Sequence, residues 1–214
     1  MKRVLISGAG VAGPALAFWL SRFGYRVTLV ERASALREGG QAVDFRGPVH
    51  RTVLERMGLW GALEQLRTQP QAMAFVDAQG EPYVRLPEVM MAGDLEVLRG
   101  DLCRLLYERT ERDVDYRFGE RIVALQEEDA GVTVDFEHAA RERFDLVIGA
   151  DGLHSGLRRL AFGPETAHLR HHDYRIASFA APHLRGKSGL TEVYSVPGRA
   201  VSRQRWARTH GLSR

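Results

Sequence analysis

Apolar residues near the start of the chain form two short continuous runs, residues 4–6 and residues 27–30. Such runs are typical of parallel strands that are covered on both faces. Between them, apolar residues recur every three or four positions, which predicts a helix that buries one face. We expect that face to consist of Ala12, Ala15, Leu16, Trp19, Leu20 and Phe23. The hydrophobic pattern therefore predicts a strand, a helix and a second strand within residues 1–32.

Three glycines stand at the junction between the first strand and the helix. Gly8 permits a tight turn, Gly10 leaves room for a pyrophosphate beside backbone N–H groups, and Gly13 lets the helix pack closely on the strand. The second strand ends in Glu31, near the position from which a carboxylate reaches the ribose hydroxyls of an adenosine. Because all these features occur in the required order, we predict a dinucleotide site. The unit alone does not distinguish NAD, NADP and FAD.

Shorter elements follow this unit. The glycine-rich residues 33–48 are expected to form a loop, either close to a ligand or on an ordinary surface. Helices are predicted at residues 49–57, 59–66 and 97–106, and a hairpin at residues 72–77 and 82–86. Strands are predicted at residues 114–117, 121–126 and 132–136 as a meander, at residues 144–150 as a buried parallel strand, and at residues 178–180 and 191–196 as the start of another sheet.

Two polar positions carry chemical information. Arg99 stands at the start of a predicted helix, where a cation is poorly placed unless it meets an anion such as a phosphate; solvation of the side chain is the other explanation. Asp151 and Gly152 follow directly after the predicted strand at residues 144–150. In an open α/β sheet, the carboxyl ends of the strands are the edge where ligands bind.

Composition and charge exclude several classes of protein. The 214 residues contain one cysteine, Cys103, which rules out an internal disulfide framework, fits a cytoplasmic location and is expected to be a buried helix residue. No apolar run reaches membrane-spanning length, so we expect no membrane association. The net charge of +3 is uneven: residues 165–214 hold nine Lys and Arg against three Asp and Glu. A uniform nucleic-acid-binding surface is therefore not predicted, and the basic character belongs to the tail.

No side-chain nucleophile or metal site is evident. The segment at residues 152–156 lacks the order of residues found in a nucleophile elbow, and the catalytic residues stay unknown. The pair His171 and His172 has no nearby cysteine and no third ligand at metal-site spacing, which favours an exposed loop.

Three motifs together resemble the flavoprotein aromatic hydroxylases, the single-component FAD-dependent monooxygenases of the p-hydroxybenzoate hydroxylase-like and tetracycline-modifying type. They are the three glycines with Glu31-Arg32, the segment Arg99-Gly-Asp101-Leu102, and the segment from Asp145 to Arg158 that contains Asp151-Gly152. The resemblance covers about residues 1–200 and implies a Rossmann-like FAD-binding domain. That domain would be an α/β fold with a parallel sheet and a β-meander, joined to an incomplete β-rich substrate domain.

The resemblance also implies roles for individual residues. The glycines would hold the FAD pyrophosphate, Glu31 the adenosine ribose, and Arg32 would lie beside the adenine. Arg99 would reach the phosphate and ribityl region, and the loop that contains Arg46 would run beside the flavin ring. Asp151 and Gly152 would belong to a motif associated with FAD and the nicotinamide donor.

By the same resemblance, NADH or NADPH would reduce FAD, and O₂ would supply the hydroxyl group for an aromatic or polyketide-like small molecule. The family's later Gly-Asp motif is absent, so a truncated hydroxylase is expected, with residues 203–214 a possible frameshifted tail. The expected domains are residues 1–163, with a hairpin insertion at about 70–90, and residues 164–214. A catalytically inactive remnant or nucleotide-binding module is the alternative, and an NAD-dependent dehydrogenase is less favoured because it leaves Arg99 and Asp151-Gly152 unexplained.

Overall fold

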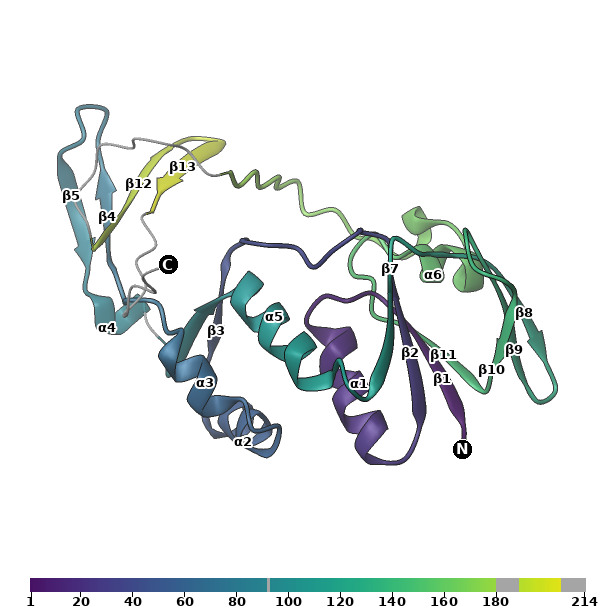
Figure 1. The fold of residues 1–214 in the computed structure, drawn as a ribbon. Helices are drawn as coiled ribbons and strands as arrows, with labels where there is room; N and C mark the ends of the chain where they lie inside the picture. The colour runs from purple at the N-terminus through teal and green to yellow at the C-terminus, as the bar shows by residue number, and fades with distance from the viewer. Residues whose placement is uncertain (92, 180–188, 205–214) are drawn as a thin grey trace. The chain divides into compact units, whose positions relative to one another are not determined.

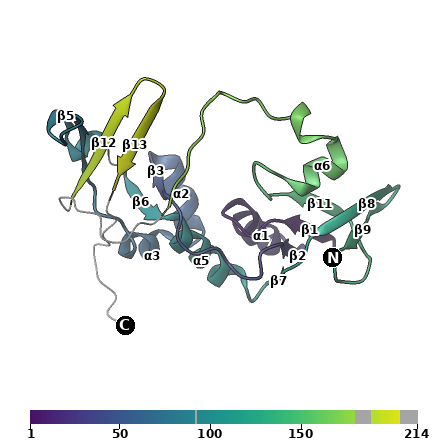
Figure 2. The ribbon, with the colours of Figure 1, turned by 90° about the horizontal axis from the view of Figure 1, so that it is seen from above.

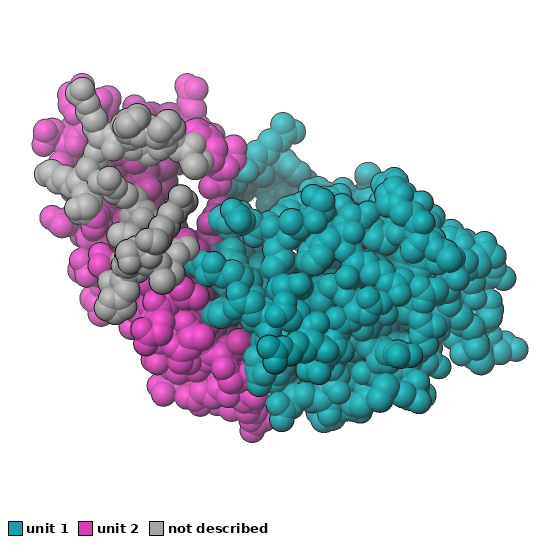
Figure 3. Space-filling view, viewed as in Figure 1, with its two compact units in different colours: residues 1–39, 99–176 teal, residues 40–98, 177–214 magenta. Residues whose placement is uncertain are grey.

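The computed structural model of the protein describes residues 1–91, 93–179 and 189–204. The chain divides into two compact units, which are coloured separately in Figure 3. Unit 1 consists of residues 1–39 and 99–176, and unit 2 of residues 40–98 and 177–214. None of the helices in the described part of the chain is long and apolar enough to cross a membrane.

A four-stranded parallel sheet forms the centre of unit 1 (Figure 1). Its order is β11-β1-β2-β7, and every neighbouring pair is parallel. The strands are β1 (Arg3–Ser7), β2 (Arg26–Glu31), β7 (Val114–Phe118) and β11 (Leu146–Gly149). Helix α1 (Ala12–Arg22) connects β1 to β2, which confirms the predicted strand–helix–strand unit.

Alternating residues of β1 belong to two different hydrophobic cores. Val4 and Ile6 pack with Ala17 of α1, whereas Leu5 packs with Phe144 and other residues of the meander. The sheet therefore lies between helices on one face and antiparallel strands on the other, because successive side chains of a strand point to opposite faces. Figure 2 shows α1 between the parallel sheet and α5 (Arg99–Thr110). The predicted α/β class, with a parallel sheet and a meander, is confirmed.

The buried face of α1 differs from the predicted one. Pro14, Ala17 and Phe18 are buried, whereas Phe23 is 73% exposed. The helix packs against the sheet on one side and against α5 on another. The guanidinium of Arg109, on α5, lies 5.4 Å from the centre of the Phe18 ring. The second contact rotates the buried stripe away from the one that the spacing of large apolar residues predicted.

One strand prediction in unit 1 was wrong, and another was right in part, because Leu146–Gly149 forms the predicted parallel strand beside β1. Val114–Phe118 joins the parallel sheet beside β2 instead of the meander, because α5 carries the chain across one face of the sheet first. The predicted strand at residues 144–150 is two strands that separate at Asp145, whose carboxylate accepts a hydrogen bond from the Arg3 backbone N–H at 2.6 Å. The meander consists of β8 (Ile122–Glu128), β9 (Gly131–Phe136) and β10 (Glu142–Phe144). Helix α6 (Gly156–Phe162) and a short 3₁₀ helix, η1 (Glu165–Ala167), complete the unit.

The described residues of unit 2 form three short helices, a two-stranded ribbon and a second sheet. The helices are α2 (Pro48–Arg56), α3 (Trp60–Gln65) and α4 (Glu88–Met91). The antiparallel ribbon consists of β3 (Ala42–Phe45) and β6 (Leu95–Leu98). The segment at residues 33–48 is therefore not entirely a loop, and the helix predicted from residue 97 begins at Arg99. The predicted loop missed β3, whereas the predicted helix is confirmed except for its first two residues, which belong to β6. Both strands are too short to show a period of two before their pairing is known.

The second sheet brings together segments that are far apart in the sequence. Its order is β13-β12-β4-β5, with β12 parallel to β4. The strands are β4 (Ala72–Val76), β5 (Pro82–Leu86), β12 (Leu190–Val196) and β13 (Arg199–Arg203). The predicted hairpin at residues 72–86 is confirmed, but it shares a sheet with residues 190–203.

The predicted strand at residues 191–196 is confirmed as part of β12, which has a partner on each side. Residues 178 and 179 form no strand, and residues 180 and 205–214 lie outside the described residues. Unit 1 continues to residue 176, so it includes residues on both sides of the expected domain boundary between residues 163 and 164. The division into an FAD-binding and a substrate domain stays a prediction.

Candidate functional site

Gly8 and Gly13 are required by the packing of the turn between β1 and α1. Gly8 has φ = +110°, and a Cβ on it would lie 2.6 Å from the carbonyl oxygen of Ala150. A Cβ on Gly13 would overlap the carbonyl oxygen of Gly8. The Gly8 N–H donates to the Val30 carbonyl at 2.8 Å. These two glycines therefore let the turn lie against the carboxyl ends of β2 and β11.

Gly10 has open space beside it, with one cation nearby. Apart from chain neighbours, a Cβ on Gly10 would lie within 4 Å of one described atom, Nη2 of Arg99, at 3.7 Å. Helix α1 begins here with no side-chain cap on Val11 and no acidic residue in its first turn. The first N–H groups of a helix lack partners within the helix and attract anions. Arg99 and the start of α1 thus form a positively polarised corner of unit 1.

Glu31, at the end of β2, contacts the same turn. Its Oε2 accepts a hydrogen bond from the Ala9 N–H at 2.9 Å, and its Oε1 accepts one from the Ala33 N–H at 3.0 Å. The side chain of Arg32 is exposed next to it. The structure therefore brings Gly8, Gly10, Gly13, Glu31 and Arg99 into one region, with Arg32 at its exposed side.

Asp151 and Gly152 lie beyond the carboxyl end of β11, in the same unit. The Ala150 N–H donates to the Ser7 carbonyl at 2.8 Å, which places this segment beside the glycine turn. The Asp151 carboxylate accepts hydrogen bonds from Ser155 Oγ and from the Leu157 N–H, the latter at 3.0 Å. Gly152 has φ = +84° and is exposed. In this arrangement the carboxylate of Asp151 stabilises the start of α6.

Arg46 belongs to unit 2, and its contacts lie within that unit. Its Nε donates to the Asp44 carboxylate at 2.6 Å, and its Nη2 donates to the Met91 carbonyl at 3.3 Å. The side chain is still 61% exposed. The structure therefore shows Arg46 on an ordered turn after β3, and its predicted position beside a flavin stays a prediction.

Sequence reasoning missed Ser155, which is a neighbour of Asp151. Ser155 is buried, and its Oγ accepts a hydrogen bond from the Arg158 N–H at 2.9 Å as the N-cap of α6. The sequence signal for this cap is a serine three residues before the N–H that it binds.

The predicted burial of Cys103 on a helix is confirmed. Burial raises the pKa of its thiol, and the positive charge and hydrogen bond of Arg99 oppose that shift. Helical spacing of four residues links Cys103 to Arg99.

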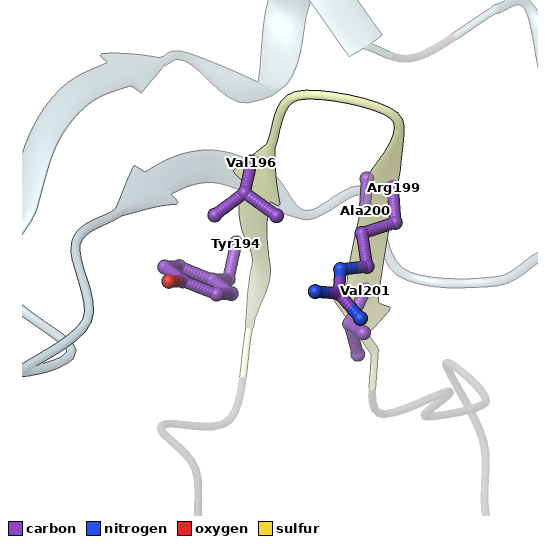
Figure 4. Close-up of a pocket in the computed structure, with 5 residues that line it drawn as sticks. All are labelled: Tyr194, Val196, Arg199, Ala200 and Val201. Atoms are coloured by element: carbon purple, nitrogen blue, oxygen red, sulfur yellow. The ribbon is translucent and has the colours of Figure 1, made fainter.

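A second surface feature lies on the sheet of unit 2. A shallow hollow with a volume of about 320 Å³ lies along β12 and β13. Figure 4 shows the side chains that line it. Its lining is mainly apolar and consists of Tyr194, Val196, Arg199, Ala200 and Val201. Within the described ranges, no group of three or more His, Cys, Asp or Glu side chains could hold a metal ion. The hollow thus offers an apolar surface with one cation, whereas the glycine turn combines an uncapped helix start with the cation of Arg99.

Comparison with known proteins agrees with the geometry of the turn. An uncharacterized protein of Mycobacterium tuberculosis strain H37Rv is 44% identical over 219 residues, covering 95% of this chain and 59% of the relative. A flavin-dependent monooxygenase of Legionella longbeachae is 36% identical over 192 residues, covering 88% of this chain and 49% of the relative. The crystal structure of tetracycline destructase Tet(51) superposes with a TM-score of 0.78 at 33% identity, covering 96% of this chain and 53% of that one.

The chain thus spans about half to three-fifths of the length of these relatives. The resemblance to FAD-dependent monooxygenases that the three motifs predicted is confirmed. The family described as "FAD binding domain" matches residues 1–179, which include the glycine turn, Glu31, Arg99 and Asp151. The chain belongs to this family of FAD-binding domains.

Proposed function

We propose that the chain is the FAD-binding part of a monooxygenase that uses NADH or NADPH and O₂ to hydroxylate a small aromatic or polyketide-like molecule. One oxygen atom of O₂ would enter the substrate as a hydroxyl group, and the other would leave as water with two electrons from NAD(P)H. Relatives named flavin-dependent monooxygenase and tetracycline destructase support this activity. Because the chain spans about half their length, the complete reaction is a proposal for the chain together with any further sequence.

The single observation that carries the proposal is the position of Arg99 over Gly10. The guanidinium lies 3.7 Å from the place of a Cβ that Gly10 lacks, at the uncapped start of α1. An anion between them would meet a cation, unpaired N–H groups and the positive end of a helix dipole. It would also resolve the unfavourable position of Arg99 at the start of α5. The turn thus fits a dinucleotide pyrophosphate.

The other predicted residues extend this site. Glu31 would accept from the adenosine ribose, Arg32 would lie beside the adenine, and Arg46 beside the flavin ring. Asp151 would keep the start of α6 in position through its hydrogen bonds to Ser155 and Leu157. Gly152, which has no side chain, would leave its backbone accessible to FAD and to the nicotinamide donor. Bound FAD would supply the redox chemistry, passing electrons from NAD(P)H to O₂. The described residues bind and orient, and none is proposed as a nucleophile.

The visible spectrum of the purified protein tests the function. A protein that is yellow, or becomes yellow with added FAD, and that oxidises NAD(P)H in air supports a monooxygenase. A colourless protein that gains no flavin contradicts it. A yellow protein that oxidises neither NADH nor NADPH would support a flavin-binding module without oxygenation.

Arg99→Gln tests the anion site. Loss of the cation is expected to weaken FAD binding by roughly 10- to 100-fold, the effect of a charge-assisted hydrogen bond. Quenching of FAD fluorescence on binding measures the affinity. Arg112→Gln removes the same charge from an exposed residue of unit 1 and serves as the matched control. Equal affinities of the two variants would remove the argument for a pyrophosphate beside Arg99.

A further inference from the structure

We propose that Glu31 is a positioning residue that holds the glycine turn in its dinucleotide-binding conformation before any ligand arrives. This inference rests on the proposed function, since it concerns the preparation of the same FAD site. It assigns to Glu31 a role within the free protein, in addition to the ribose contact that the resemblance implies.

The carboxylate of Glu31 bridges two backbone segments. Oε2 accepts from the Ala9 N–H at 2.9 Å, between the first two glycines, and Oε1 accepts from the Ala33 N–H at 3.0 Å, two residues beyond Glu31 itself. The side chain is partly buried. Both oxygens therefore have backbone donors inside the protein, and charge-assisted bonds of this kind are the stronger ones.

The backbone around Glu31 is fixed independently of that side chain. The Glu31 carbonyl accepts from the Glu120 N–H at 3.0 Å, and the Ala33 carbonyl accepts from the Gly119 N–H at 2.9 Å. Gly119 and Glu120 form the turn between β7 and β8. The backbone of residues 31–33 is thus held by the β7–β8 turn, and the Glu31 carboxylate connects this backbone to the glycine turn.

The hydrogen bonds of the Glu31 carboxylate determine which backbone N–H groups remain for a ligand. The N–H groups of Gly8 and Ala9 are bonded to the Val30 carbonyl and to Glu31. The N–H groups at the start of α1 that precede Ala15 have no acceptor within the helix, and the Arg99 guanidinium lies beside Gly10 at this point. A carboxylate has about four acceptor sites, so Glu31 keeps capacity for a ribose hydroxyl while it holds the turn.

Amide hydrogen exchange in the ligand-free protein tests the proposal. In Glu31→Ala, the amides of Ala9 and Ala33 are expected to exchange roughly tenfold faster or more, as expected for loss of a charge-assisted bond, while the amides of β1 stay protected. FAD is expected to bind roughly tenfold more weakly or worse, because the turn is no longer prepared. Glu127→Ala, at an exposed position on β8, is the matched control.

The outcomes separate this proposal from the proposed function. Unchanged exchange at Ala9 and Ala33 would overturn it even if FAD binding fell, because Glu31 would then act on the ribose alone. Equally faster exchange throughout β1 and β2 would also overturn it, as a global loss of stability. If Glu31→Ala does not fold, Glu31→Gln replaces it. The glutamine side chain keeps one acceptor oxygen, so faster exchange at the backbone amide of either Ala9 or Ala33 supports the positioning role of Glu31. These readings need no bound FAD and hold whether or not the protein is an oxygenase.

Discussion

The three glycines of the turn are needed for different physical reasons. Gly8 adopts a positive φ and lies close to the Ala150 carbonyl, and Gly13 lies against the Gly8 carbonyl. Gly10 has neither constraint. Apart from its chain neighbours, the described atom nearest to a Cβ placed on Gly10 is Nη2, at the far end of the Arg99 side chain. Folding accounts for Gly8 and Gly13, and the proposed FAD site would account for Gly10.

Alanine at these positions is expected to separate stability from binding. Gly13→Ala forces a Cβ into the Gly8 carbonyl and should destabilise the protein by about 1–3 kcal/mol or more, as overpacking does. Gly10→Ala should leave the melting temperature of the ligand-free protein nearly unchanged but weaken FAD binding. Thermal denaturation and FAD titration of both variants measure the two effects. A Gly10→Ala variant that binds FAD with full affinity would show that no ligand approaches this backbone.

Glu120 is a buried carboxylate that fixes the ends of the meander. It accepts hydrogen bonds from the N–H groups of Arg121 and Glu137 at 2.9 Å, of Ala139 at 2.8 Å and of His138 at 3.2 Å. Burial raises the pKa of this carboxyl, but the four backbone donors outweigh burial and lower it below its usual value. Because the folded pKa is depressed, this stability is present above the unfolded pKa and is lost as the pH falls through the folded value.

Glu120→Gln is therefore expected to destabilise the protein by about 1–3 kcal/mol at pH 7, since it replaces charge-assisted bonds with one neutral acceptor. The difference from the unsubstituted protein should shrink below about pH 4.3, the ordinary pKa of a glutamic acid, and continue to shrink through the lower folded pKa. Urea denaturation between pH 7 and pH 3 measures this difference. Glu127→Gln, at an exposed position on β8, should show neither effect. A pH-independent loss in Glu120→Gln would exclude the carboxylate as its cause.

Among the elements, those defined by local pattern were predictable and those defined by distant partners were not. The run at residues 4–6, the glycines and the run at residues 27–30 specify β1, α1 and β2 locally. The placement of β7 beside β2 depends on pairing between residues about ninety positions apart, and the break at Asp145 depends on the backbone of Arg3. Neither interaction leaves a trace in a short sequence window.

The candidate site divides in the same way. The residue types of the glycine turn and Arg99 were recognisable because their chemistry is local: a missing Cβ, and a cation at the start of a helix. Which atoms they meet was not recognisable. The Asp151 carboxylate binds Ser155 Oγ and the Leu157 N–H, a contact that needs α6, which the hydrophobic pattern did not predict. Helix α6 has seven residues, too few for a clear helical period.

Ser155 connects the Asp151 carboxylate to α6, and Ser155→Ala is expected to affect both. Loss of an N-cap hydroxyl should destabilise the protein by about 0.5–2 kcal/mol. The Arg158 N–H would lose its acceptor, and Asp151 would lose the Ser155 hydroxyl as a donor but keep the Leu157 N–H. Thermal denaturation measures the loss, with Ser34→Ala, at an exposed position in unit 1, as the control. Equal stability of the two variants would mean that Ser155 contributes no capping energy.

At the scale of the whole molecule, the chain passes between the two units three times, after residues 39, 98 and 176. Neither unit is continuous in sequence. In unit 2, β12 is hydrogen-bonded to β4 across more than a hundred residues, so the sheet of that unit needs both ends of its chain. A cut in the connection between the units would therefore leave each unit with its own pairing partners.

Limited proteolysis with chymotrypsin tests this organisation. Residues 171–179 contain no helix or strand, and Tyr174 and Phe179 are 86% and 84% exposed, so cleavage is expected there first. Phe162 is 72% exposed but lies in α6, whose backbone bonds should protect it. Mass spectrometry identifies the first cut, and a Tyr174→Ser/Phe179→Ser variant should resist it. The two fragments should co-elute in native size-exclusion chromatography, because β12 stays paired with β4. First cleavage after Phe162, or separation of the fragments without denaturant, would contradict the division into these two units.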